Sequence, residues 1–153
     1  MYKTLKPALI AAAALIGVAV PAGAQEISAI KDGIHVIQGK GGNIGVSAGA
    51  DGVFMIDDQF APATETILDK IKSVSDQPVR FLVNTHFHRD HTGGNENLGK
   101  AGVLFFAHDN VRERLLGGNA PAASLPVVTF NDTTTFHMNG QTIEVFHTEA
   151  AHT

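Results

Sequence analysis

The segment at residues 84–95 constrains this chain more than any other part of its sequence. It reads Asn-Thr-His-Phe-His-Arg-Asp-His-Thr-Gly-Gly-Asn. Four side chains that can bind a metal ion fall within six residues of it, namely His86, His88, Asp90 and His91. The segment follows Val79–Val83, a short, largely apolar run that is typical of a strand buried on both faces. The fold must therefore hold a cluster of metal-binding groups at the end of a buried strand.

The types and spacing of these side chains predict a zinc site. Neutral imidazole and carboxylate suit zinc when no thiolate is available, and the chain has no Cys. If strand geometry continues into the segment, His86 and His88 point the same way and can hold one ion. After a turn, Asp90 and His91 can face a second position. The alternative is a surface loop that happens to be rich in histidine.

Composition places the chain among globular proteins and excludes several classes. It has 153 residues, 44% of them hydrophobic and 17% charged, as expected for one globular domain. Without Cys it holds no disulfide framework. The formal net charge of −4 argues against nucleic-acid binding, which requires a basic face.

The first 24 residues resemble a secretory signal peptide, and residues 25–153 are predicted to form the domain. Lys3 and Lys6 precede an apolar run at residues 8–20, and Ala22-Gly23-Ala24 has the small residues of a cleavage site. The run is too short for a membrane anchor, which needs roughly 20 residues. We therefore expect a periplasmic or secreted protein with no membrane segment after cleavage. Loss of the two lysines leaves nine basic residues against 15 acidic ones, a net charge of −6.

The rest of the sequence predicts strands first and then alternating helices and strands. Asp32-Gly33 and Asn139-Gly140 are typical of two-residue hairpin turns. Pro62 is expected to open a helix, whose apolar stripe consists of Ile67, Leu68, Ile71 and Val74. The other predicted elements are strands within residues 27–38, 43–56, 103–107 and 127–146, and a helix at residues 109–116.

At the histidine-rich segment the sequence resembles the metallo-β-lactamase superfamily. The His-x-His-x-Asp-His signature is followed by Gly-Gly-Asn, as is frequent in that family, and the hairpin-rich start and Ile56-Asp57-Asp58 fit it too. The resemblance implies an α+β fold, a four-layer αββα sandwich of which this chain holds the N-terminal portion. It also implies one or two zinc ions at the sheet edges.

The resemblance assigns the ligands. His86 and His88 would bind the first zinc ion, and Asp90 and His91 the second. The third histidine of the first ion would be His152, in the sequence Ala150-Ala151-His152-Thr153. In the implied mechanism a zinc-bound hydroxide attacks a carbonyl, and Asp90 orients the nucleophile.

In the family, a bridging Asp or Cys and a last His follow the third histidine. Neither follows His152 in this sequence. We therefore expect the first zinc site to be the more complete one and the domain to be incomplete at its C-terminus. Half a sandwich would expose an apolar sheet surface and open strand edges, which favours self-association.

Several other polar residues carry competing interpretations. Asp57 resembles the Asp that supports the metal loop in the family, or it is a plain strand-end residue, and Asp58 is expected to be its exposed neighbour. Arg89 is a candidate contact for an anionic substrate. His147 is interpreted as an ordinary polar residue, with a substitute metal ligand as the alternative. No role is predicted for His35, His108 or His137, nor for Arg112, Glu113 and Arg114, which resemble a solvated helix face.

Three function classes follow. The first is a zinc-dependent hydrolase of a small ester, thioester, lactone or β-lactam. The second is a catalytically impaired metal-binding fragment or interaction module. The third is a nuclease or an oxygen-reducing di-iron protein of the same superfamily. The acidic charge disfavours the nuclease, and the di-iron branch usually has Glu where this chain has His88.

Overall fold

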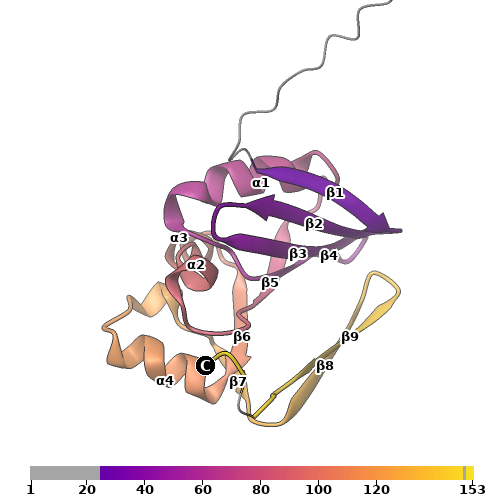
Figure 1. Ribbon diagram of the computed structural model, residues 1–153. Coiled ribbons are helices and arrows are strands. Elements are labelled where there is room, and N and C mark those ends of the chain that lie inside the picture. The colour runs from indigo at the N-terminus through magenta and orange to yellow at the C-terminus, as the bar shows by residue number, and fades with distance from the viewer. Residues whose placement is uncertain (1–24, 150) are drawn as a thin grey trace, which may run out of the picture.

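The computed structural model describes residues 25–149 and 151–153 (Figure 1). The predicted signal peptide at residues 1–24 lies outside the described residues. Within the described part of the chain, no helix is long and apolar enough to cross a membrane.

The first four strands form an antiparallel meander. They are β1 (Glu26–Lys31), β2 (Ile34–Gly39), β3 (Gly42–Gly49) and β4 (Gly52–Ile56). The predicted turn at Asp32-Gly33 joins β1 to β2. Gly33 has a φ of 70°, a conformation that L side chains rarely adopt. The Asp32-Gly33 turn therefore allows β1 and β2 to pair as an antiparallel hairpin.

Three parallel strands extend the same sheet to seven strands. β5 (Val79–Val83) lies beside β4, followed by β6 (Leu104–His108) and β7 (Val128–Phe130). β5 has the predicted bounds, and β6 is shifted by one residue from the predicted 103–107. The carboxyl ends of parallel strands meet at one edge of a sheet, where ligand sites typically form.

Helices connect the parallel strands. They are η1 (Ala61–Ala63), α1 (Thr64–Lys72), α2 (Arg89–Thr92), α3 (Asn95–Lys100), α4 (Asp109–Gly117) and η2 (Ala122–Ser124). Of the stripe predicted for α1, Ile67 and Ile71 are buried. Val74 was wrongly included, because the helix ends at Lys72 and Val74 lies beyond it, partly exposed.

Alternation along β4 sends side chains to two separate apolar clusters. Val53 and Met55 join the cluster that contains Ile67 and Ile71 of α1. Phe54 points to the other face and joins the second cluster. The sheet is therefore covered by helix on one face and by another layer on the other.

That other layer is the hairpin of β8 (Thr133–Met138) and β9 (Gln141–Phe146) (Figure 1). Its Phe136 ring meets the Phe54 ring edge-on at 4.9 Å. The mixed fold with helical and sheet layers is as predicted, and among the described residues the second sheet has two strands.

Candidate metal centre

The histidine-rich segment forms a tight turn at the carboxyl end of β5. Strand geometry ends at Val83, and α2 begins at Arg89. Strand geometry therefore does not continue into the segment, and the chain turns between His86 and His88. The turn nevertheless brings their rings together, with centroids 4.8 Å apart.

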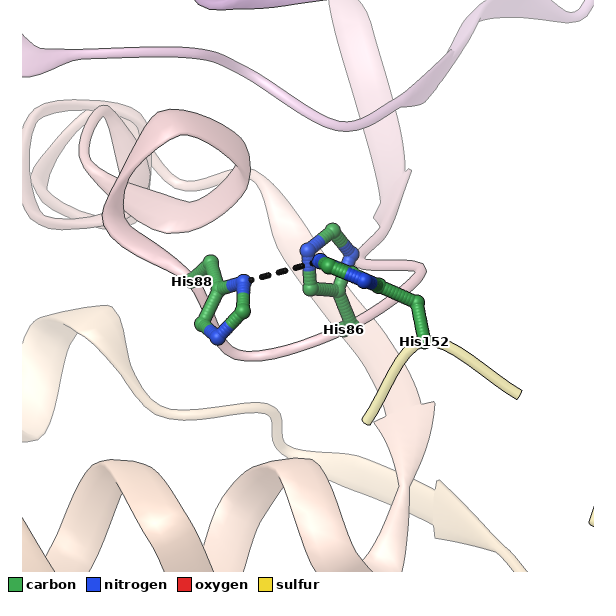
Figure 2. Close-up of side chains that lie close together, drawn as sticks. All are labelled: His86, His88 and His152. Carbon is green, nitrogen blue, oxygen red and sulfur yellow. Dashed lines mark hydrogen bonds between the residues drawn. The ribbon is translucent and has the colours of Figure 1, made fainter. Parts of the chain in front are cut away.

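His152 completes a cluster of three histidines (Figure 2). One nitrogen from each of His86, His88 and His152 lies within 4.8 Å of the other two. His152 Nε2 is 3.2 Å from His88 Nδ1. Residues that are 64 positions apart in the sequence thus converge in an arrangement that can hold one metal ion.

The protonation of His86 suits metal binding. Its Nε2 is buried and has no hydrogen-bond partner among the described residues. Burial lowers the pKa of His86 below its ordinary value, and the neighbouring His91 lowers this pKa further. The ring is therefore neutral near pH 7, and neutral imidazole is the form that binds zinc. The buried, unpartnered nitrogen fits a metal ligand.

Asp57 ties the metal loop to the end of β4. Its carboxylate accepts hydrogen bonds from the Thr85 backbone N–H at 2.8 Å and from the Thr85 hydroxyl at 2.7 Å. Asp57 Oδ2 also lies 2.7 Å from His91 Nδ1. Thr85 Oγ1 is in turn 3.0 Å from His86 Nδ1. Asp57 has the contacts of a supporting residue. Thr85 was missed by the sequence analysis, although its hydroxyl immediately precedes the first histidine.

Asp90 and His91 lie beside the cluster without joining the set of three. His91 Nε2 is 3.5 Å from Asp90 Oδ2, and the His91 ring centroid is 4.0 Å from that of His86. Both residues come from α2. Their assignment to a second metal ion stays a prediction.

The Gly-Gly-Asn that follows has a steric and polar explanation. A Cβ on Gly93 would lie 2.7 Å from the Gln59 carbonyl oxygen, and one on Gly94 would lie 3.0 Å from the Asp58 carboxyl carbon. Asn95 and Asn84 exchange two side-chain hydrogen bonds of 2.9 and 3.1 Å. The three residues therefore close the metal loop against the strands.

Asp58 is buried, and the prediction of an exposed neighbour is wrong. It is 1% exposed, and its Oδ1 accepts a hydrogen bond from the Gly94 N–H. Its Oδ2 has no partner among the described residues. Burial raises the pKa of Asp58 to about 8.

The backbone of Asp57 is left-handed, with a φ of 63°, and helps to turn the chain after β4. A pattern of apolar and polar residues cannot reveal this conformation.

The remaining histidines lie apart from the cluster. His147 stacks on His108 with ring centroids 4.1 Å apart, and neither belongs to the set of three. His35 is on β2 and His137 on β8. Arg89 is exposed on α2.

A cavity of about 530 Å³ opens beside the three histidines. His86 and His152 line it together with apolar residues of the sheet and of β9, and the side of α4 closes it. Its volume is in the range that small-molecule sites occupy, about 300–1,000 Å³. A bound metal ion would thus adjoin a space for a small molecule.

Comparison with known proteins gives one family. The family model described as the metallo-beta-lactamase superfamily matches residues 37–153. The fold is similar to that of the metallo-beta-lactamase from Pontibacter korlensis, with a TM-score of 0.67 and 26% identity over 80% of this chain and 60% of that one.

Two further solved structures share the fold. DIM-1 metallo-beta-lactamase gives a TM-score of 0.66 at 22% identity, covering 80% of this chain and 58% of that one. A metallo-beta-lactamase from Cronobacter sakazakii gives 0.64 at 20% identity, covering 76% and 52%. The chain thus spans 52–60% of the length of these three structures.

Proposed function

This chain belongs to the metallo-beta-lactamase superfamily, and we propose that it is a zinc-dependent hydrolase of small acyl compounds. The bond it cleaves is the acyl bond of an ester, thioester, lactone or β-lactam. The observation that carries the proposal is the convergence of His86, His88 and His152 beside a cavity of about 530 Å³.

The three imidazoles would hold the ion. When bound, zinc supplies a Lewis acid that polarises a carbonyl and lowers the pKa of a water molecule to about 7. The buried Nε2 of His86 and the His88–His152 pair present nitrogen donors from two segments. Asp90, whose carboxylate lies beside His91 Nε2, would accept a hydrogen bond from the attacking water and orient it.

Two considerations favour a β-lactam among these substrates. The similar structures are those of metallo-beta-lactamases, and we propose that this protein too is exported, to the periplasm or beyond, on the basis of its N-terminal sequence. Export disfavours glutathione thioesters, which are chiefly cytosolic. Fold alone does not select a substrate, since one fold serves many functions.

The test is hydrolysis by the purified protein with zinc added and after metal removal. We expect turnover of a chromogenic cephalosporin, p-nitrophenyl acetate or a thioester only when zinc is present. Zinc binding without turnover of any of these compounds would favour the non-catalytic metal-binding module. Equal turnover with and without zinc would overturn the proposal.

A further inference from the structure

Arg114 is the one lysine or arginine among the described residues that line the cavity beside the three histidines. We propose that Arg114 recognises a carboxylate on the substrate, so that the substrate class is a carboxylated acyl compound with an apolar body. This inference rests on the proposed function for its acyl chemistry. Arg114 is exposed, as expected for a solvated helix face, and it also lines the cavity.

The position of Arg114 is set by an aromatic ring of the metal loop. Its guanidinium carbon lies 4.8 Å from the centroid of the Phe87 ring, an arrangement that attracts a cation to the ring face. The Phe87 ring is 4.6 Å from the His88 ring. Arg114 is therefore one aromatic ring away from the three-histidine cluster, at a separation that one small molecule can span.

Arg114 is free to bind an anion. Among the described residues, no carboxylate lies within salt-bridge distance of its guanidinium. Glu144 also lines the cavity, from the hairpin side, but it does not pair with Arg114. A planar guanidinium matches a carboxylate with two parallel hydrogen bonds.

Two imidazoles add polar groups to the same wall. His108 and His147 stack at 4.1 Å and both line the cavity. His108 Nδ1 accepts a hydrogen bond from the Asn110 backbone N–H at 3.1 Å. In the neutral ring the proton is therefore on Nε2, which can donate to an anion.

The charge and the lining define the ligand. A single permanent cation matches a monoanion such as a carboxylate better than a phosphate dianion. Phe130, Ile143 and Val145 provide apolar surface in the same cavity. The ligand therefore combines one carboxylate with an apolar body, and its reactive carbonyl would lie toward His86 and His152.

The test uses binding without catalysis, so that it is independent of the proposed hydrolysis. The full-length protein is stripped of metal and desalted, and the affinity of 4-phenylbutyrate is compared with that of 4-phenylbutyramide by NMR titration. We expect the acid to bind at least tenfold more tightly than the amide. Equal affinities, or tighter binding of 3-phenylpropylphosphonate than of the acid, would overturn the proposal.

Variants locate the site. Arg114→Gln should weaken binding of the acid at least tenfold and leave the amide unchanged, whereas Arg114→Lys, which keeps the charge, should lose less. Lys100→Gln makes the same charge change at an exposed position outside the cavity and should bind both compounds as the native protein does. An equal loss in Arg114→Gln and Lys100→Gln would refute the assignment, whether or not zinc-dependent hydrolysis is found.

Discussion

Asp57 acts on two imidazoles at once. An ionised carboxylate can only accept hydrogen bonds, so the Thr85 hydroxyl donates to Asp57 and its oxygen is free to accept from His86 Nδ1. The direct contact with His91 Nδ1 has the same effect on that ring. Both rings then carry their proton on Nδ1 and leave Nε2 as a metal donor.

Removing the Thr85 hydroxyl should therefore weaken metal binding without removing a ligand. Thr85→Val breaks the chain from Asp57 to His86, and we expect zinc affinity to fall about 10- to 100-fold, as is typical for groups that orient metal ligands. The measurement is competition with a chromophoric chelator. Thr135→Val, at an exposed position of β8, is the control, and equal affinities of the two variants would contradict the role of Thr85.

The three-histidine cluster predicts the zinc content. We expect at most about one tightly held ion, because three imidazoles converge while Asp90 and His91 offer fewer donors. His86→Ala should abolish zinc retention after dialysis, and His35→Ala on β2 should not. Metal analysis that finds two tightly held ions, or equal retention in both variants, would show the ligand assignment to be wrong.

Buried Asp58 predicts a pH dependence of stability. Its pKa is about 8 in the folded protein against 3.8 for the exposed group, so the folded state binds the proton more strongly. Its contribution to stability is complete below pH 4 and is lost as the pH rises toward 8. The free energy of unfolding should therefore fall as the pH rises through that range.

Asp58→Asn removes this titration and keeps an oxygen for the Gly94 N–H. We expect the stability of the variant relative to the native protein to rise between pH 4 and 8 and to level off above. Urea unfolding at a series of pH values measures it. A stability difference that is independent of pH would rule out this titration.

At the scale of elements, the β8–β9 hairpin is anchored at its tip. Asn139 accepts a hydrogen bond from the Asp51 N–H at 3.1 Å, and the Asn139 N–H donates to Asp51 Oδ2 at 2.6 Å. The Asn139 side-chain amide also donates to the Gly52 carbonyl at 3.0 Å. The hairpin that leads toward His152 is thereby fixed to the β3–β4 turn.

Asn139→Ala should loosen this anchor. The substitution removes side-chain hydrogen bonds that each contribute about 0.5–1.5 kcal/mol. Alanine also adopts the left-handed backbone at residue 139, with a φ of 55°, less readily than asparagine does. We expect about 1–3 kcal/mol of destabilisation in urea unfolding. Asn131→Ala, at an exposed position before the same hairpin, should change stability by less than about 0.5 kcal/mol, and similar effects of both would count against the anchor.

Local signals explain which elements could be predicted. The hairpin turns and the bounds of β5 follow from Asp-Gly, Asn-Gly and a short apolar run, because neighbouring residues determine them. The burial of Asp58 and the role of Thr85 depend on contacts with Gly94 and Asp57 that are distant in sequence. Convergence of His152 with His86 was expected from the family resemblance, since neither periodicity nor spacing brings such distant residues together.

At the scale of the whole molecule, the two sheets are unequal, with seven strands against two among the described residues. β7 lies at one edge of the large sheet, and its Val128 is exposed. Phe146, at the end of β9, is 67% exposed. Apolar side chains beside strand edges favour contacts between molecules.

We therefore expect the protein to self-associate as its concentration rises, with Phe146→Ser reducing the apparent mass. Light scattering over a concentration series measures this. Ile30→Ser removes an equally exposed side chain, 66% exposed on β1, and should leave association unchanged. A constant monomer mass for the native protein would disprove the prediction.

The separation between His88 and His152 has a consequence for the order of folding. The two rings cannot meet until the intervening strands and the hairpin have formed, because closing so long a loop must precede any gain from the contact. The seven-stranded sheet can assemble from nearer neighbours first. A metal ion would then bind late in folding, after most of the structure has formed. Its contacts would stabilise the folded state more than the folding transition state, so zinc should slow unfolding much more than it accelerates refolding.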